Sequence, residues 1–244
     1  KHMKCGEFDK RNLDYSNTFS SKEYFRRLIL GKEYAKQPSV NRQGKGKIIF
    51  DVGAHRGESA TFFHKLFPDA NIYSFEPNYS AAKDIIDSEI PNVMVHEIAL
   101  SNYDGSAKFN IQDISHLSSL HNINQDSSHS LGYAERERHT SIDVEVERGD
   151  TFMKKHKISE IDLLKIDVQA NEVETIQGFS SVLNKIRAVF VEVSMYDFYN
   201  SRSSIRLIEE SLPNFELFDI YEISKNPKTL GTDWATMVYT NQFS

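Results

Sequence analysis

Short apolar runs alternate with amphipathic stretches along most of this chain. Continuous apolar runs are typical of buried strands, whereas apolar residues three or four positions apart are typical of helices that cover a sheet. We predict strands at 48–50, 70–75, 93–100, 142–146, 161–168, 187–194, 215–223 and 234–240, and helices at 58–67, 80–90, 150–156, from 172 onward and at 202–212. This alternation predicts an α/β domain with a mostly parallel sheet.

Two segments fall outside this alternation. Residues 1–46 are expected to form an N-terminal extension before a domain that spans 47–244. Within the extension, 21–35 has the spacing of an amphipathic helix, which is compatible with a cap over the site, a homodimer contact or plain packing on the sheet. Residues 111–140 are rich in Ser, Asn and His and too long for an ordinary connection, so we expect a lid, a binding loop or disorder there.

Composition and charge narrow the function class. Of the 244 residues, 39% are hydrophobic and 26% are charged, which is typical of a globular protein. No apolar run approaches the roughly 18 residues that span a membrane. The net charge of −6 disfavours nucleic acid as the partner, because such binding needs clustered Lys and Arg. Cys5 is the single cysteine and no secretory signal is visible, so a cytoplasmic location is expected.

The turn after the first predicted strand has the pattern of a cofactor site. It reads D-x-G-x-x-x-G, and Glu76 and Pro77 follow the second strand. In open α/β sheets ligands bind at the carboxyl ends of the strands, and an acid about 20 residues past a glycine turn accepts ribose hydroxyls. A structural turn is the alternative interpretation. The predicted cofactor-binding residues of this turn are Asp51, Gly53, Ala54, His55 and Gly57.

The charge of Asp51 indicates which nucleoside cofactor binds. A dinucleotide site places a glycine-rich turn against a pyrophosphate, and a carboxylate at the end of the strand would repel that group. The same carboxylate attracts the ammonium and the sulfonium of S-adenosylmethionine. We therefore predict S-adenosylmethionine as the cofactor. An NAD-dependent oxidoreductase would share the fold and Glu76, but the chain lacks the G-x-G-x-x-G pattern.

Acidic residues in two further strands are candidates for the acceptor side. Lys165 and Asp167 fall on one face near the end of the fourth sheet strand, and Glu192 lies near the end of the fifth. Charges in apolar strands are costly unless they are paired or functional. An ion pair of Lys165 with Asp167 or with Glu172 is the structural alternative. Asp167 and Glu192 are our candidate catalytic acids, and Asp167 is also a candidate cofactor contact.

Three weaker candidates remain. Ser101 and Asp104 follow the third strand, where an adenine ring would lie, but the local sequence is equally good hairpin-turn chemistry. The loop 111–140 holds four histidines in no metal-binding pattern, so no metal is predicted. One of them, with His121 as the candidate, would serve as a general base, although a solvated loop histidine is the commoner case.

Four segments together resemble one known family. The runs DVGAHRGESA, FEPN, ALSNYDG and LLKIDVQANEVETIQGF resemble the FkbM family of S-adenosylmethionine-dependent methyltransferases, in order and over most of 47–240. The chain differs at His55, where asparagine is common in the family, and at Ala170 and Asn171, where glycine and alanine are common.

The resemblance implies a fold and an activity. It implies a Rossmann-like class I methyltransferase with a seven-stranded, mostly parallel sheet, helices on both faces, and an antiparallel edge hairpin formed by the last two strands. It places Asp167 beside the transferred methyl group and slightly favours 118–120 as cofactor-side residues. It implies O-methylation of a sugar, glycan or natural-product hydroxyl. A catalytically silent module that binds the cofactor or a glycan is the alternative.

Overall fold

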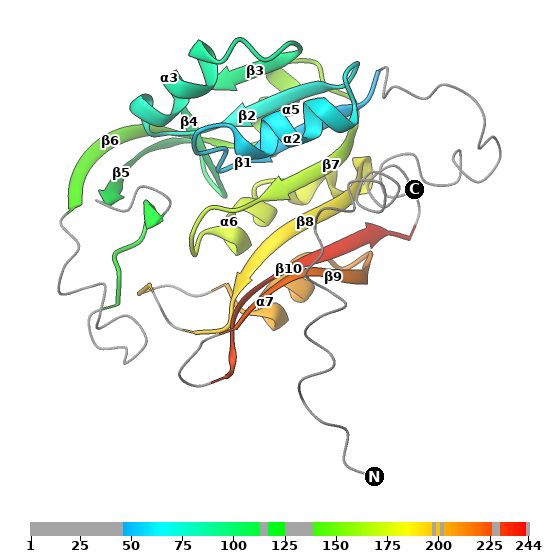
Figure 1. The fold of residues 1–244 in the computed structure, drawn as a ribbon. Coiled ribbons are helices and arrows are strands. Elements are labelled where there is room, and N and C mark those ends of the chain that lie inside the picture. Colours follow the sequence, from blue (N-terminus) through cyan, green and yellow to red (C-terminus); the bar gives the residue numbers. More distant parts are fainter. Residues whose placement is uncertain are drawn as a thin grey trace. The chain divides into compact units, whose positions relative to one another are not determined.

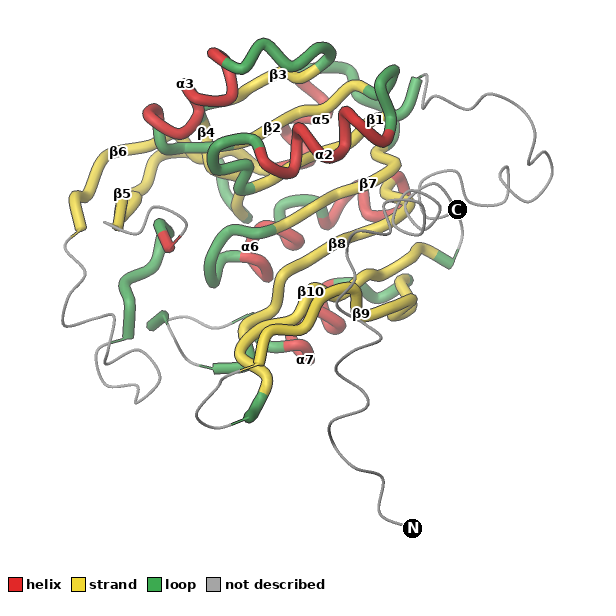
Figure 2. The backbone as a smooth tube through the Cα atoms, in the orientation of Figure 1, coloured by secondary structure: helices red, strands yellow, loops and turns green. Residues whose placement is uncertain are grey.

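The structure is a computed structural model that describes residues 46–112, 117–124, 139–196, 199–200, 203–225 and 230–242. Figures 1 and 2 show the elements in these ranges. The strands are β1 (Ile48–Val52), β2 (Asn71–Phe75), β3 (Val93–His96), β4 (Ile98–Ser101), β5 (Gly105–Gln112), β6 (His139–Arg148), β7 (Ile161–Ile166), β8 (Ile186–Ser194), β9 (Phe215–Lys225) and β10 (Thr232–Asn241). The helices are α2 (Glu58–Leu66), α3 (Tyr79–Asp87), α5 (Gly149–Lys155), α6 (Glu172–Gln177), the 3-10 helix η2 (Ser180–Lys185) and α7 (Ile205–Ser211).

The main sheet has the strand order β3-β2-β1-β7-β8-β10-β9. The first five strands in this order, from β3 to β8, pair in parallel, and β10 runs antiparallel to both β8 and β9. The predicted mostly parallel sheet with an antiparallel edge hairpin is therefore confirmed. The strand order reverses between β1 and β7, and ligands of open α/β sheets bind at the carboxyl ends of the strands beside such a reversal.

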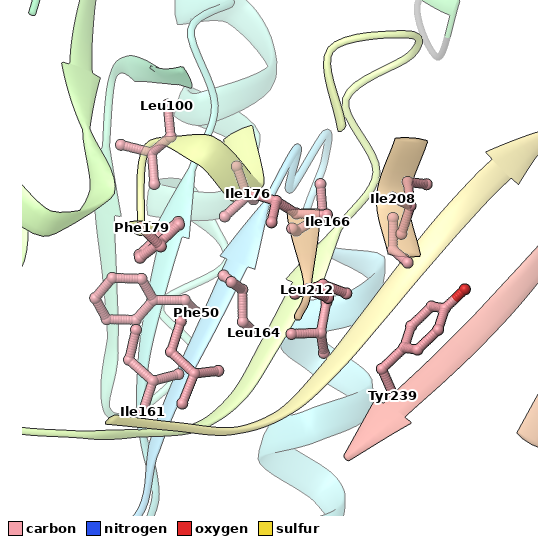
Figure 3. Close-up of a cluster of buried hydrophobic side chains, with 14 of the residues drawn as sticks. Phe50, Leu100, Ile161, Leu164, Ile166, Ile176, Phe179, Ile208, Leu212 and Tyr239 are labelled. Atoms are coloured by element: carbon pink, nitrogen blue, oxygen red, sulfur yellow. The ribbon is translucent and has the colours of Figure 1, made fainter. Parts of the chain in front are cut away.

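The core lies on both faces of this sheet, because alternate strand residues point to opposite sides. Phe50 of β1 and Leu164 of β7 belong to the cluster that contains Ile176 of α6 and Ile208 of α7, and Figure 3 shows these side chains gathered on one face. Ile49, on the other face, is also fully buried, and α2 and α3 lie on that side (Figure 2). Helices thus cover both faces and leave the strand ends to form a site.

The segment that follows β2 differs from the prediction in two ways. The strand predicted at 93–100 is broken at Glu97, because β3 belongs to the main sheet whereas β4 joins β5 and β6 in a second sheet of order β4-β6-β5. The turn at 101–105 is not a hairpin turn, since β4 and β5 both pair with β6 and not with each other.

The irregular segment predicted at 111–140 is also shorter than expected. Its two ends belong to β5 and β6, which pair in register from Gly105 to Gln112. The strand β5 was missed because polar residues, Asn110 and Gln112, occupy buried positions in it and hide the apolar alternation.

The predicted extension 1–46 lies outside the described residues except for Gly46, so its helix and a homodimer contact stay predictions. Among the helices that the structure describes, none has both the length and the apolar character needed to cross a membrane.

Candidate functional site

The turn between β1 and α2 is held against two neighbouring strand ends. The backbone N–H groups of Gly53 and Ala54 both donate to the carbonyl oxygen of Phe75, at 3.0 and 3.1 Å. Gly53 has a φ of +75°, and a Cβ on it would collide with the backbone oxygen of Asp167. Only glycine allows so close an approach. The predicted glycine turn therefore touches both the end of β2 and the residue that follows β7.

The rest of the turn leads into α2. Gly57, with a φ of +90°, is the N-cap residue of this helix, and His55 has a φ of +48°. Asparagine and histidine tolerate left-handed backbone better than most residues do. This backbone gives a physical reason why asparagine is common at position 55 in the family that the sequence resembles, and why histidine can replace it.

Glu76 lies at the end of β2 and is 7% exposed. One carboxylate oxygen accepts from the backbone N–H of His55 and the other from that of Asn78, both at 2.9 Å. Burial raises the pKa of Glu76 to about 7, although both hydrogen bonds favour its ionised form. Each oxygen keeps a lone pair for a further donor. Pro77, between Glu76 and Asn78, leads into the cap of α3, where the Asn78 side chain accepts from Ser80 N–H.

Lys165 connects the turn with the end of β7. Its Nζ donates to the carbonyl oxygen of Gly53 at 2.8 Å and lies 3.1 Å from Asp51 Oδ1 and 3.7 Å from Asp167 Oδ2. Burial alone would lower the pKa of Lys165, but the two carboxylates together outweigh it and the pKa is raised. Burial raises the pKa of Asp51, which is fully enclosed. The sequence argument from the charge of Asp51 did not include this partner.

The two candidate catalytic acids share one neighbour. Gln169 Nε2 donates to Asp167 Oδ1 at 3.0 Å and to Glu192 Oε1 at 3.2 Å. Burial, followed by the charges of Asp167 and Glu172, raises the pKa of Glu192 to about 9. Glu192 is therefore protonated at neutral pH, while Asp167 has a side chain that is 36% exposed. The structure places the predicted pair together at the carboxyl ends of β7 and β8.

Glu172 begins α6 as predicted and is buried. Its Oε1 accepts from the backbone N–H of Ala170 at 3.0 Å. Burial raises the pKa of Glu172 to about 7. This carboxyl group holds the loop that carries Gln169 and does not pair with Lys165, whose carboxylate neighbours are Asp51 and Asp167.

The two weak adenine candidates have structural contacts. Ser101 is buried at the end of β4, with its Oγ 3.4 Å from Asn171 Nδ2. The Asp104 carboxylate accepts from the backbone N–H of Arg148 at 2.7 Å and from Thr151 Oγ1 at 3.0 Å, at the start of α5. Each oxygen of Asp104 therefore has one structural donor, and its role toward a cofactor stays a prediction.

His121 lies in the short described segment 117–124. Its backbone N–H donates to Ser119 Oγ at 3.0 Å, and among the described residues its buried Nε2 has no hydrogen-bond partner. His116 and His129 lie outside the described residues. No group of three His, Cys, Asp or Glu side chains in the described ranges is arranged to hold a metal ion.

Sequence reasoning missed Gln169 and its contacts with distant segments. Ser119 Oγ donates to the backbone oxygen of Gln169, and Tyr199 Oη lies 3.1 Å from Gln169 Oε1. An uncharged side chain in a loop carries no signal of its own. The one available hint was its place between Asp167 and Glu172 in a segment dense with polar residues.

The arrangement fits S-adenosylmethionine. Asp51 is completely buried, and Lys165, whose Nζ lies 3.1 Å from Oδ1, is the ion-pair and hydrogen-bond partner that the described residues give its carboxylate. Glu76 has lone pairs left for ribose hydroxyls. The turn 53–57 lies at the N-terminus of α2, where the helix dipole favours the carboxylate of the cofactor's methionine part. One ammonium, that of Lys165, lies beside two carboxylates, which leaves a net negative charge to meet a cationic cofactor.

Comparison with known proteins gives an independent result. The sequence profile described as "Methyltransferase FkbM domain" matches residues 51–219. The chain is 30% identical over 176 residues to the 2-O-methyltransferase NoeI of Sinorhizobium fredii, which covers 70% of this chain and 72% of that protein. It is 22% identical over 149 residues to the hexuronic acid methyltransferase AglP of Haloferax volcanii, covering 60% of this chain and 55% of that protein. The match therefore spans little more than half of AglP.

Among solved structures, the magnesium protoporphyrin IX methyltransferase of Synechocystis, determined with bound cofactor, aligns with a TM-score of 0.47 and 7% identity, covering 92% of this chain and 81% of that one.

Proposed function

This chain belongs to the methyltransferase FkbM family and uses S-adenosylmethionine, and we propose that its acceptor is a hydroxyl group of a sugar or glycan. The observation that carries the proposal is the contact of Lys165 with both Asp51 and Asp167, which joins the cofactor turn to the acceptor-side acids. The names of the two relatives, one an O-methyltransferase and one acting on a hexuronic acid, support a sugar acceptor.

The residues of this chain divide the work. When bound, S-adenosylmethionine supplies an electrophilic methyl group. Glu76 holds the ribose. Asp167 accepts the proton of the acceptor hydroxyl while the oxygen of that hydroxyl bonds to the methyl carbon. The bound cofactor would supply the leaving group as well, because the bond from that carbon to sulfur would break with its electron pair kept on sulfur. Alignment and a positioned base are the protein's main contributions to such a transfer.

The charges on the acceptor side favour a hydroxyl over a carboxylate as the acceptor group. Burial, followed by the nearby charges of Asp167 and Glu172, raises the pKa of Glu192 to about 9. A further carboxylate would meet the same repulsion, and like charges placed together discriminate against a ligand. A protonated Glu192 is instead a hydrogen-bond donor for a neutral acceptor. We therefore propose an uncharged hydroxyl-bearing acceptor.

Calorimetry tests the cofactor half of this proposal. We expect S-adenosylmethionine and S-adenosylhomocysteine to bind and NAD not to bind. Glu76→Ala should weaken S-adenosylhomocysteine binding about 10- to 100-fold, because hydrogen bonds to a charged group contribute about 1.5–3 kcal/mol. Unchanged affinity in this variant would reject the role of Glu76.

Transfer of an isotope-labelled methyl group tests the acceptor half. The substrates are a panel of methyl glycosides of neutral hexoses, 6-deoxyhexoses and hexuronic acids. We expect product from neutral glycosides. In Asp167→Asn we expect the rate of methyl transfer to fall at least about 100-fold while S-adenosylhomocysteine still binds. Asp69→Asn, an exposed change in the turn before β2 and so at the amino ends of the parallel strands, is the matched control. Transfer to the uronides alone would overturn the proposed acceptor class.

A further inference from the structure

The side chain of Gln169 joins the two acceptor-side acids. Its amide nitrogen faces the carboxyl groups of Asp167 and Glu192, and its amide oxygen faces the phenol of Tyr199. Asp167 has a second neighbour, Lys165, at its other oxygen. For the Glu192 side chain, Gln169 is the one hydrogen-bond partner that the described residues provide. Glu192 therefore depends on Gln169 for its orientation more than Asp167 does.

The backbone around Gln169 is held in an unusual conformation. Gln169 and Ala170 have φ values of +54° and +79°, which side-chain-bearing residues rarely adopt. Two consecutive residues of this kind persist only where their surroundings impose them, and such strain gathers at functional sites. Here the Ser119 hydroxyl, bonded to the backbone oxygen of Gln169, and the Glu172 carboxylate, bonded to Ala170 N–H, hold the loop.

We propose that Gln169 is a positioning residue that sets the direction in which the carboxyl groups of Asp167 and Glu192 face the acceptor hydroxyl. The proposal rests on the methyl transfer proposed above and deepens it. One amide that donates to both acids fixes their relative orientation. Asp167 is then left to accept the hydroxyl proton and Glu192 to donate to a neighbouring acceptor oxygen.

The contacts that hold the loop do not need the Gln169 side chain. Ser119 bonds the backbone oxygen of Gln169, and Tyr199 Oη also lies 2.9 Å from the backbone oxygen of Leu117. The side chain can therefore be changed while the segment 117–124 stays attached. Gln169→Leu removes the amide at similar size and is the direct probe.

The first readout is the titration of Glu192, which is measured by carbon-13 NMR of labelled carboxyl groups. The Glu192 signal is assigned by its loss in Glu192→Gln. The charged groups that face Glu192 are Asp167, Glu172 and Lys165. Because the hydrogen bond from Gln169 favours the ionised form, Gln169→Leu should make Glu192 titrate at a higher pH than in the wild type. A purely structural Gln169 would leave this titration unchanged.

The second readout is turnover with the methyl glycoside that the wild type accepts best. We expect Gln169→Leu to lower kcat about 10- to 100-fold while S-adenosylhomocysteine affinity stays within about twofold, since small misplacements of reacting groups cost this much. Tyr199→Phe, which removes the hydroxyl contacts with the amide oxygen and with the backbone oxygen of Leu117 but leaves the amide nitrogen on both acids, should act in the same direction and more weakly. Gln242→Leu is the control, because Gln242 follows the end of β10 and its amide donates to Glu216.

Different results would overturn the proposed function and the proposed role of Gln169. Unchanged titration and turnover in Gln169→Leu, with the wild type active, would overturn the role of Gln169 alone. A wild type that binds no S-adenosylhomocysteine would reject the proposed function, while the NMR titration would still decide whether Gln169 orients Glu192. A variant that lost stability and cofactor binding but kept the wild-type titration would identify Gln169 as structural and overturn the proposal.

Discussion

The proposed site has two halves that are built differently. In the cofactor half, residues 51–76, the turn and Glu76 are held by backbone N–H groups and by close approach at Gly53. In the acceptor half, Asp167 and Glu192 are held by side chains, above all by Gln169. Backbone contacts do not depend on which side chains are present, so they suit a site whose ligand is always the same cofactor. Side-chain contacts change when residues are substituted, so they suit a site whose acceptor differs between related enzymes. Lys165 contacts both halves, so it is the place to test how far they depend on each other.

The largest expected effect is that of Lys165→Met. Removing the ammonium leaves the fully buried Asp51 without an opposite charge, which costs about 3–5 kcal/mol in the free energy of unfolding. Urea denaturation measures this loss. The double variant Asp51→Asn/Lys165→Met should recover most of it. Lys108→Met breaks an exposed pair with Asp143 at 2.8 Å and should cost about 0.5 kcal/mol or less. Equal losses in the two lysine variants would show that burial does not matter here.

The second prediction tests the close approach inside the cofactor half. Gly53→Ala places a methyl group against the Asp167 backbone oxygen, and we expect a loss of about 3 kcal/mol or more from overlap and left-handed strain together. Gly46→Ala is a matched control, because Gly46 has a φ of +74° and no atom within 4 Å of a new Cβ. It should cost about 1 kcal/mol, because strain of about 1–2 kcal/mol is partly offset by about 0.4–1 kcal/mol of lost unfolded-state entropy. Similar thermal stability in the two variants would exclude the collision.

The third prediction separates the halves by pH. The pKa of Glu76 is about 7 in the folded protein against an ordinary 4.5, so between these values the folded state binds more protons than the unfolded state. This contribution to stability, roughly 3 kcal/mol, is full below pH 4.5 and is lost as the pH rises through 7. For Glu192 the same loss extends to about pH 9. Urea midpoints from pH 4 to 10 check both windows.

Each glutamine variant should remove one contribution to this profile. Glu76→Gln should make the profile less steep between about pH 4.5 and 7, where Glu172 and Glu192 still contribute, and Glu192→Gln should flatten its extension from about pH 7 to 9. A wild-type profile that rises with pH across both windows would contradict the raised pKa values. Ionised Glu76 is also the better acceptor for ribose hydroxyls, so S-adenosylhomocysteine affinity should increase through about pH 7.

The sequence predicted the cofactor half because its determinants are local. Asp51, Gly53 and Glu76 follow two buried strands, and the parallel sheet brings those strand ends together without any other information. The alternation of apolar runs was enough to predict the elements of the main sheet. The antiparallel edge hairpin was implied by the family resemblance, and the order of the strands was not predicted, since the apolar pattern carries no information on which strands pair.

The acceptor half was less predictable because it is assembled from distant segments. Glu192 and Asp167 were found as charges in apolar strands, but Gln169 is an uncharged loop residue whose contacts with these acids and with Tyr199 form only when the chain folds. The pairing of Lys165 with Asp51 spans more than a hundred residues, and the sequence alone indicated only Asp167 or Glu172 as its partner. The break at Glu97 went unnoticed because β3 and β4 follow one another with a single residue between them.

The smallest expected effect concerns Ala170, which stands where the family commonly has glycine. Its φ of +79° costs an alanine about 1–2 kcal/mol, and glycine would remove that strain. Glycine would also lose a methyl group packed with Ile123 and Tyr199, worth about 0.8 kcal/mol, and would add roughly 0.4–1 kcal/mol of unfolded-state entropy. These terms nearly cancel, so the unfolding free energy of Ala170→Gly should stay within about 0.5 kcal/mol of wild type.

Ala60→Gly is the comparison that isolates the strain at position 170. Ala60 is fully buried inside α2, where the backbone is right-handed and alanine is the favoured residue. Replacing it loses a packed methyl group and helix propensity with no relief of strain, so about 2 kcal/mol should be lost. If Ala170→Gly were as destabilising as Ala60→Gly in urea, the left-handed backbone at 170 would carry no cost. The departure from glycine would then reflect packing against Ile123 and Tyr199 alone.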